Sequence, residues 1–244
     1  MIRYILVCIT VVGFLILSIP LIIIEWIIGK FAPHAKDISS LAIVNAVFRF
    51  CLFLAGARPT IIGEENVPKD KAVLYIGNHQ SFFDILLTYV RVPRPTGYVA
   101  KLEMKKIPLL NIWMHYLHCQ FLDRKNIKEG LKTILKCIEK IKNGISICIF
   151  PEGTRSKNKD EFLPFHDGSF KIATKTNCPI IPIAINNSSA IFEDQFPKMK
   201  KTHVIIEYGK PIILDELSDE NKKQIGTYTR NIIKAMYDKN KELL

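Results

Sequence analysis

A histidine and an aspartate, His79 and Asp84, lie five residues apart in a segment that begins where an apolar run ends. The run before them is typical of a buried strand, and the apolar residues 85–87 after them indicate the start of a helix. Strand-to-helix junctions of this kind often carry the active-site groups of α/β folds. If His79 lies in the loop, Asp84 can accept a hydrogen bond from one imidazole nitrogen and leave the other free to take a proton from an alcohol. The pair therefore predicts a general base that works without a serine nucleophile.

The same residues also have a purely structural interpretation, which the sequence leaves open. Five residues along an ideal helix amount to about 500°, so His79 and Asp84 can meet only if His79 lies outside the helix. Ser81-x-x-Asp84 matches a capping box, in which Asp84 only supports the helix N-terminus. A lipid hydrolase is disfavoured because the chain has no Gly-x-Ser-x-Gly segment and Ser81 is better placed as a helix cap.

A second polar segment leaves the apolar run 145–150 and contains Glu152, Gly153, Thr154 and Arg155. The planar guanidinium of Arg155 suits two oxygens of a phosphate group. Glu152 can orient that guanidinium or accept from a substrate hydroxyl, and Gly153 permits close approach of the backbone. These residues predict an anion site, and a plain turn with a surface ion pair is the alternative.

Arg124 is another guanidinium that follows a short apolar run, at residues 120–122. It can join Arg155 around one phosphate group. For either arginine taken alone, a solvated loop position is the more common outcome.

A possible metal site is suggested by His115, His118 and Cys119, since the two imidazoles fall on one side of a helical turn. No second pair of ligands accompanies them, so we interpret these residues as packing residues. We expect no metal at the active site.

The polar segments require a scaffold of strands to position them. After Arg58 the chain alternates short apolar runs with amphipathic stretches. Each run is typical of a strand. The predicted strands are 72–76, 98–100, 120–122, 145–150, 180–185 and 204–208.

The helices between and after these strands complete the prediction of fold class. Apolar residues recur at helical spacing from Ile127 to Ile141, and Gly144 is placed to end that helix. A helix that leads directly into a buried strand indicates an α/β fold, with a central, mostly parallel sheet flanked by helices. Residues 217–244 are expected to form a peripheral helix packed on the sheet.

The first 57 residues predict a membrane-associated pair of helices. Residues 4–24 are almost continuously apolar, long enough for one bilayer crossing at about 20 residues per span, and a cleaved signal peptide is disfavoured. Residues 41–57 are amphipathic, because Asn45 and Arg49 share one face, and a helix lying in the membrane interface would keep Arg49 hydrated. We therefore expect an anchor at 1–57 and a catalytic domain at 58–244.

The chain carries 34 Lys and Arg against 23 Asp and Glu, a net charge of +11 that favours an anionic partner. The basic residues are dispersed, without the aromatic-interleaved runs of nucleic-acid binders, so a membrane surface is favoured and nucleic acid is not expected. Six scattered cysteines without a Cys-x-x-Cys motif fit a reducing compartment.

Taken together, these segments resemble the glycerolipid acyltransferase family, specifically the bacterial 1-acylglycerol-3-phosphate acyltransferases. The resemblance covers roughly residues 68–208, with supporting matches at 101–104 and 165–170. Two departures are His166, where the family more often has lysine, and Met104, where leucine is usual. The four matching blocks, in order, are residues 78–84, 121–124, 150–156 and 181–185.

The resemblance implies transfer of a fatty acyl group from an acyl thioester to the sn-2 hydroxyl of 1-acylglycerol 3-phosphate (lysophosphatidic acid), without cofactor, metal or covalent enzyme intermediate. The donor is acyl-carrier protein thioester or acyl-coenzyme A, and the enzyme faces the cytoplasm from the inner membrane. Alternatives are another lysophospholipid or lipid amine as acceptor, or a non-catalytic protein that binds anionic lipid. The implied base and partner are His79 and Asp84, and the implied substrate-binding residues are Lys101, Arg124, Glu152, Gly153, Thr154, Arg155 and Pro182.

Overall fold

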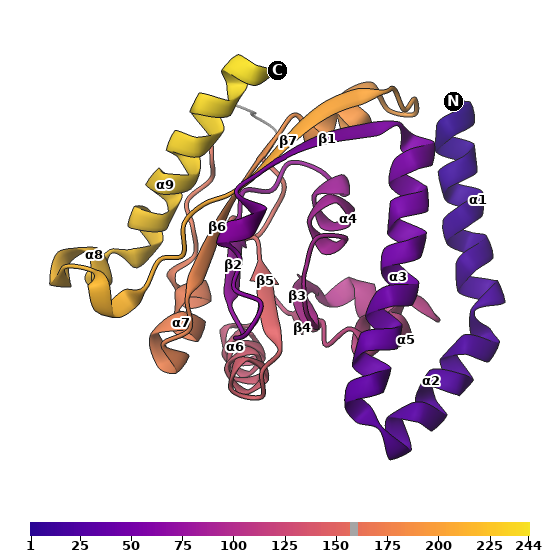
Figure 1. Cartoon of the computed structure of the whole chain (residues 1–244), viewed down its shortest axis with the longest axis horizontal. Coiled ribbons are helices and arrows are strands. Elements are labelled where there is room, and N and C mark those ends of the chain that lie inside the picture. The colour runs from indigo at the N-terminus through magenta and orange to yellow at the C-terminus, as the bar shows by residue number, and fades with distance from the viewer. Residues whose placement is uncertain (157–160) are drawn as a thin grey trace.

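A computed structural model describes residues 1–156 and 161–244 of the chain and shows a central seven-stranded sheet (Figure 1). The strand order is β1-β7-β6-β2-β5-β3-β4. The strands are β1 (Ala57–Ile62), β2 (Leu74–Gly77), β3 (Thr96–Lys101), β4 (Gln120–Leu122), β5 (Ser146–Ile149), β6 (Ile180–Asn186) and β7 (Thr202–Tyr208).

The sheet is mostly parallel, which confirms the predicted fold class. Strands β2 to β6 all run in one direction, and β7 pairs antiparallel with β6 and parallel with β1. All six predicted strands are present. The sequence did not predict β1, because this edge strand carries Arg58, Pro59 and Thr60 in place of an apolar run. Proline is tolerated at a sheet edge, where its missing N–H removes no ladder hydrogen bond.

Helices cover both faces of the sheet, as Figure 1 shows. Alternate residues of the central strands β2, β3, β5 and β6 contribute to two separate cores, one under α1 to α5 and the other under α6, α7 and α9. The helices of the sheet domain are α4 (Phe83–Tyr89), α5 (Leu110–Tyr116), α6 (Ile127–Lys142), α7 (Lys171–Thr176), α8 (Asp219–Lys223) and α9 (Ile225–Asn240).

Three helices, instead of the predicted pair, form the N-terminal region: α1 (Ile2–Leu17), α2 (Ile19–Phe31) and α3 (Pro33–Ala55). The predicted helix at 4–24 is bent by 52° at Ser18. Pro20 lies in the first turn of α2, where its ring cannot donate the hydrogen bond that would continue α1 and clashes with the preceding turn. The second predicted helix begins earlier than expected, at Pro33, a favourable first residue of a helix.

The N-terminal helices pack on the sheet domain through polar contacts, two of which are buried and one of which, from the exposed Arg49, is partly buried. The indole Nε1 of Trp113 in α5 donates to Oγ of Ser18 at 2.9 Å, and the Tyr116 hydroxyl donates to the carbonyl of Ile22 at 3.1 Å. Arg49 of α3, expected to be hydrated at the membrane interface, donates to the carbonyl of Val90 at 3.2 Å. Helices α1 to α3 therefore form one layer of the fold, and α3 leads directly into β1.

An apolar outer surface remains on this layer. Helix α3 is long and apolar enough to cross a membrane, and the bent pair α1–α2 meets the same criterion when taken together. Large apolar side chains that point outward include Ile5, Ile9, Val12, Ile16, Ile23, Trp26, Phe31, Phe50 and Phe53. This composition indicates membrane association of the N-terminal region.

Candidate active site

Strands β2 to β6 are parallel, so their carboxyl ends all lie at the same end of the sheet. This end, which is not an edge strand, is here called the catalytic edge. Ligands of open α/β sheets bind outside this edge. Strand pairing therefore gathers segments that are more than 100 residues apart in sequence. The residues that follow or end these strands are His79 for β2, Lys101 for β3, Arg124 for β4, Glu152 to Arg155 for β5 and Glu193 for β6.

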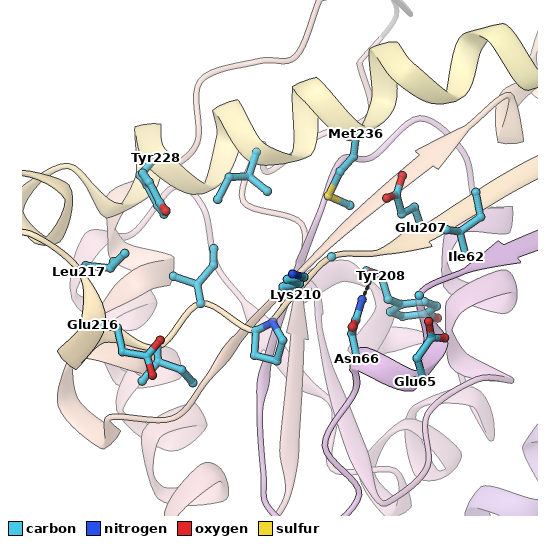
Figure 2. A pocket seen from close by; sticks show the side chains of 16 residues that line it. Ile62, Glu65, Asn66, Glu207, Tyr208, Lys210, Glu216, Leu217, Tyr228 and Met236 are labelled. Carbon is cyan, nitrogen blue, oxygen red and sulfur yellow. Dashed lines mark hydrogen bonds between the residues drawn. The ribbon is translucent and has the colours of Figure 1, made fainter.

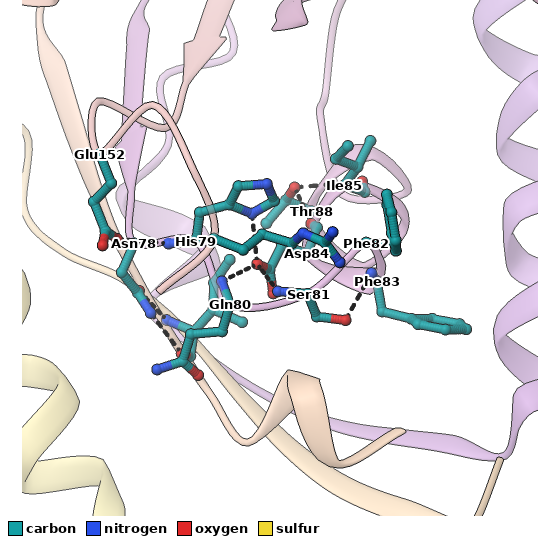
Figure 3. A network of polar contacts seen from close by, with 12 residues as sticks. Asn78, His79, Gln80, Ser81, Phe82, Phe83, Asp84, Ile85, Thr88 and Glu152 are labelled. Atoms are coloured by element: carbon teal, nitrogen blue, oxygen red, sulfur yellow. Dashed lines mark hydrogen bonds and ion pairs between the residues drawn. The ribbon is translucent and has the colours of Figure 1, made fainter. Parts of the chain in front are cut away.

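His79 and Asp84 form the predicted pair, shown in Figure 3. Nδ1 of His79 lies 2.8 Å from Oδ2 of Asp84. His79 lies in the loop before α4, as the helical-angle argument required, and Asp84 lies in the first turn of that helix. The hydrogen bond to a carboxylate places the ring proton on Nδ1, so Nε2 carries the free lone pair. None of the described residues forms a hydrogen bond with Nε2.

Asp84 combines the contacts of both interpretations that the sequence left open: it bonds the imidazole of His79 and also supports the start of the helix. Its Oδ2 accepts from the backbone N–H groups of Gln80 at 2.7 Å and Ser81 at 2.8 Å. Ser81, predicted as the helix cap, lies one residue before the N-cap position Phe82, and its Oγ accepts from the N–H of Phe83 at 3.0 Å. Asp84 is fully buried. One carboxylate oxygen thus fixes the loop that carries His79 and orients the imidazole itself.

Two further contacts immobilise His79, and Figure 3 includes the residue that makes the second, Glu152. Its ring stacks on Phe150, with centroids 4.5 Å apart and planes at 13°. Its backbone N–H donates to Oε1 of Glu152 at 2.8 Å, while Oε2 of Glu152 accepts from the N–H of Leu163 at 3.0 Å. Both oxygens of this carboxylate are therefore used to brace the site. Burial raises the pKa of Glu152, and the two N–H donors partly oppose that rise.

Arg155 lies beside the dyad and is bound to a residue that the sequence did not single out. Its Nη1 donates to Oε1 of Glu193 at 3.0 Å, and its guanidinium lies 3.8 Å from the ring centroid of Phe82. Glu193 also accepts from Oγ of Ser81 at 2.7 Å and from the N–H of Phe82 at 2.8 Å. Glu193 therefore joins the loop after β6 to the dyad loop and to the loop after β5.

The other predicted cationic residues lie on the opposite flank of the dyad. Lys101 and Arg124 are exposed and end or follow β3 and β4. In the strand order, β4 is three positions from β2, about 14 Å across the sheet. Arg155 instead reaches toward Glu193, which follows β6 on the other side of β2. The structure thus brings Arg155 to the dyad and does not place Arg124 beside it.

Comparisons with known proteins identify the family of this chain. A family model described as acyltransferase matches residues 58–186. This chain belongs to the acyltransferase family. A 1-acyl-sn-glycerol-3-phosphate acyltransferase of Saccharomyces cerevisiae is 32% identical over 192 residues, covering 78% of this chain and 62% of that protein. A protein with the same name from Borreliella burgdorferi is 30% identical over 194 residues, covering 80% of this chain and 77% of that protein.

A solved structure has the same fold as this chain. The 1-acyl-sn-glycerophosphate (LPA) acyltransferase PlsC of Thermotoga maritima superposes with a TM-score of 0.81 at 24% sequence identity, covering 98% of this chain and 95% of that one. The superposition therefore includes the N-terminal helices as well as the sheet. The resemblance drawn from the four sequence blocks is confirmed at the level of the family.

Of the remaining predicted site residues, Thr154 and Gly153 lie in the loop after β5, whereas Pro182 lies in a buried strand. Thr154 is exposed in the loop after β5. Gly153 has a φ of 71°, and a Cβ there would lie 3.2 Å from Nε2 of His166, so glycine is required for this turn. Pro182 lies within β6, where it pairs with Ile76 of β2 and is buried. Pro182 is therefore part of the sheet and not of the loops at the catalytic edge.

Figure 2 shows a pocket of about 720 Å³ next to the carboxyl end of β7. Because β7 runs antiparallel to β6, this pocket lies at the opposite end of the sheet from the dyad. It is formed by the end of β7, the segment after it and α9, and its wall includes Tyr208, Lys210, Tyr228 and Met236. None of the predicted site residues lines it.

Two residues that the sequence did not single out help to build the candidate site. The buried side chain of Asn78 exchanges two hydrogen bonds with the backbone of Ile185, at 2.9 and 2.8 Å, and so fixes the dyad loop to β6. Its position next to His79 was an available signal. Glu193 lies outside the matched family segment, and nothing in its local sequence distinguishes it from an ordinary surface carboxylate.

Of the three residues that suggested a metal site in the sequence, His118 is engaged by other side chains, His115 is exposed and Cys119 is buried. Nε2 of His118 lies 2.9 Å from Oδ1 of Asp37, and its Nδ1 lies 3.3 Å from Nζ of Lys140. Partial burial lowers the pKa of His115. Among the residues that the structure describes, no group of three or more His, Cys, Asp or Glu side chains is arranged to hold a metal ion.

Proposed function

We propose that this protein transfers a fatty acyl group from an acyl thioester to the sn-2 hydroxyl of 1-acylglycerol 3-phosphate, giving phosphatidic acid. The observation that carries this proposal is the pair of His79 and Asp84, whose 2.8 Å contact leaves Nε2 free at the catalytic edge beside Arg155. The names of the relatives from yeast and Borreliella support the choice of acceptor. The chain spans 62% of the yeast relative's length. The acceptor of that longer protein is therefore proposed, and not assigned, for this chain.

In the first step, Nε2 of His79 removes the proton of the acceptor hydroxyl as its oxygen attacks the thioester carbonyl carbon. Asp84 stabilises the resulting imidazolium, since its Oδ2 remains bonded to the protonated Nδ1. A carbon–oxygen bond forms, and the carbonyl electrons move onto oxygen in a tetrahedral intermediate. The Asp84 contact also prevents rotation of the ring, so Nε2 stays aimed at the hydroxyl.

In the second step, the intermediate collapses, the carbon–sulfur bond breaks and the thiol leaves. The leaving thiolate takes the proton from Nε2 of His79, which restores the neutral base. The reaction requires neither a metal nor a cofactor, because the thioester is itself the activated acyl donor. The donor is an acyl carrier protein thioester or acyl-coenzyme A.

The phosphate of the acceptor is bound by Arg155, whose guanidinium is already ordered by Glu193 and by the ring of Phe82. Ordering the arginine in advance reduces the conformational entropy lost on binding. Lys101 and Arg124 supply the cationic flank that attracts the anionic substrates.

The other predicted residues act mainly by shaping the site. Glu152 braces the backbone of His79, Gly153 allows the turn that presents Arg155, and Thr154 offers a hydroxyl at the rim. Pro182 shapes the acceptor or acyl site indirectly, through β6.

The acceptor and product are membrane lipids, and the outer surface of α1 to α3 is apolar. We place the enzyme at the inner membrane with the catalytic edge facing the cytoplasm, where the soluble donors and a reducing compartment are found. Protease accessibility in oriented membrane vesicles tests this orientation: cleavage of the sheet domain from the cytoplasmic side alone supports it.

The experiment that tests the function measures thioester consumption and phosphatidic acid formation by the detergent-purified full chain. The acceptors compared are lysophosphatidic acid, a zwitterionic lysophospholipid and a lipid amine. The proposal is supported if the wild type acylates only lysophosphatidic acid. If the wild type prefers another of the three lipids, that lipid is the acceptor and the proposed acceptor is wrong. A folded wild type that is inactive with every acceptor, yet binds anionic lipid vesicles, supports the alternative of a non-catalytic lipid-binding protein.

A further inference from the structure

The outer face of α6 carries an apolar stripe that the sequence pattern did not predict. The sequence predicted one apolar face for this helix, yet the structure divides its apolar residues into two groups. Ile134, Ile138 and Ile141 are buried against the sheet. The second group, here called the α6 stripe, consists of Ile127, Leu131 and Leu135, which are 91%, 49% and 55% exposed.

The α6 stripe lies beside a row of lysines. Lys128, Lys132 and Lys136 each follow a stripe residue by one position, so the row runs parallel to the stripe along the helix. All three are exposed. Residues 124–142 contain seven Lys or Arg and two Glu. Lys132 pairs with Glu129 at 2.6 Å, which leaves Lys128 and Lys136 as cations without an ion-pair partner among the described residues.

The α6 stripe is close to the catalytic edge. Helix α6 begins five residues after β4, whose carboxyl end lies at that edge, and then runs back along the sheet. Ile127 is the first residue of the helix, and Leu135 lies eight residues further, about 12 Å along its axis. The exposed Arg124 lies between the end of β4 and the α6 stripe.

A bilayer is a poor match for this surface. The outer apolar surface of α1 to α3, which includes Trp26, Phe31 and Phe53, belongs to the layer on the other face of the sheet. The α6 stripe is short and aliphatic and lacks the aromatic residues typical of membrane interfaces. A narrow apolar stripe with a row of cations alongside instead fits an amphipathic helix of an acidic protein.

We propose that the α6 stripe and its lysine row are the docking surface for a small acidic acyl carrier protein, which presents its thioester to the catalytic edge. This inference rests on the proposed acyltransferase function and selects the protein-bound thioester over free acyl-coenzyme A as the donor that uses this surface. The lysine row attracts the acidic carrier, and the stripe residues are covered when it docks.

The test compares kcat/KM for acyl carrier protein thioester and for acyl-coenzyme A, with one acyl chain and with lysophosphatidic acid as acceptor. The variants are Lys128→Glu with Lys136→Glu, and separately Ile127→Asp. The matched control is Lys222→Glu with Lys223→Glu, which makes the same change in net charge on exposed residues of a different helix, α8. Ile127 is 91% exposed, so its substitution leaves the core intact.

We expect kcat/KM with the carrier protein to fall about tenfold in both α6 variants and to change less than twofold with acyl-coenzyme A. The control should change less than twofold with either donor. Equal losses with both donors, or an equal loss in the control, would overturn the proposal. A wild type that uses acyl-coenzyme A alone would also overturn it while leaving the proposed function intact.

Two further measurements test whether a membrane or a second copy of the chain, instead of the acyl carrier protein, covers the α6 stripe. Co-sedimentation with anionic phospholipid vesicles and light scattering of the detergent-solubilised protein are run on the same variants. Loss of vesicle binding or a change of oligomeric state in the α6 variants, without a donor-specific effect, assigns the stripe to the membrane or to a second copy and overturns the proposal. If wild type is inactive with both donors, the proposed function fails, and absence of direct binding to the acyl carrier protein then rejects the docking surface separately.

Discussion

Oε1 of Glu193 lies 3.0 Å from Nη1 of Arg155, and the same carboxylate accepts two hydrogen bonds from the dyad loop. Glu193, which follows β6, therefore fixes the position of Arg155, the residue proposed to bind phosphate, relative to His79, the proposed base. Because Glu193 is only 20% exposed at its side chain, the contact with Arg155 is partly shielded from solvent.

Glu193→Gln should raise KM for lysophosphatidic acid about tenfold with a smaller change in kcat. The amide keeps the shape of the side chain but has only one acceptor oxygen, so it cannot serve all three donors, and hydrogen bonds to charged groups contribute about 1.5–3 kcal/mol. Steady-state kinetics at varied acceptor concentration provide the measurement, with Glu65→Gln at the opposite edge as the control. An unchanged KM in a folded Glu193→Gln protein would argue against this positioning role.

His79→Ala should reduce kcat by a factor of about 10²–10⁴, the usual contribution of a positioned general base. Asp84→Asn should reduce it as well, because an amide no longer favours the tautomer with a free Nε2. Asp84→Asn should also destabilise the fold, since Oδ2 accepts two backbone N–H groups in addition to the imidazole. Circular dichroism and membrane association confirm folding before rates are compared. Activity retained by folded His79→Ala would refute the proposed base.

Arg155→Lys should raise KM for the acceptor more than Arg124→Lys does. A lysine keeps the charge but loses the planar fork that can hold both Glu193 and a phosphate, whereas the exposed Arg124 lies on the other flank and acts mainly through its charge. The effect of Arg124→Lys should therefore be under twofold, and Arg124→Glu should weaken binding in a salt-dependent way. A larger effect at Arg124 than at Arg155 would exchange the two assignments.

Stability should depend on pH through Glu152. Its pKa is raised above the ordinary 4.5 by burial, so between pH 4.5 and the raised pKa the folded protein binds more protons at this site than the unfolded chain. The contribution of Glu152 to the free energy of unfolding therefore falls as pH rises through that window. Thermal denaturation of wild type and Glu152→Gln across this range provides the measurement, with the difference between the two curves expected to shrink as pH falls. A difference that does not vary with pH would contradict the prediction.

Trp113→Phe should lower the thermal stability of the detergent-solubilised protein, because the buried hydroxyl of Ser18 loses the indole donor at 2.9 Å. The loss of such a hydrogen bond costs about 1 kcal/mol. Trp26→Phe is the matched control, since the Trp26 side chain is 57% exposed on α2. Equal melting temperatures for Trp113→Phe and Trp26→Phe would show that the contact between α5 and the bend at Ser18 does not stabilise the fold.

The strands and the dyad were accessible from the sequence because both are encoded locally. Apolar runs such as 180–185 exceed what a surface segment would carry, and each became a strand. The five-residue spacing of His79 and Asp84 at the end of such a run allowed their contact on the condition that His79 lies in the loop, and the structure meets that condition. The edge strand β1 was not predicted because Arg58, Pro59 and Thr60 take the place of an apolar run.

Local sequence patterns did not predict where a helix bends or which of its apolar residues are buried. The bend at Ser18 divides an apolar run whose composition does not change across it, and only Pro20 marks the break. Likewise, the apolar residues of α6 have the same character in the sequence, yet Ile134 is buried and Ile127 is exposed. Which apolar residues are covered depends on how far the sheet extends beneath the helix, and that is a property of the assembled layers.

The sequence by itself determined the family, the α/β scaffold, the His79 and Asp84 pair and an apolar N-terminal region, because each depends on residue type and short-range spacing. The tertiary structure alone decided that Glu193 orders Arg155, that Glu152 braces His79, and that Arg124 lies on the other flank of the dyad. These relationships depend on strand order, since β6 and β4 lie on opposite sides of β2. Strand order is set by how all layers pack together, and no local segment of the chain carries that information.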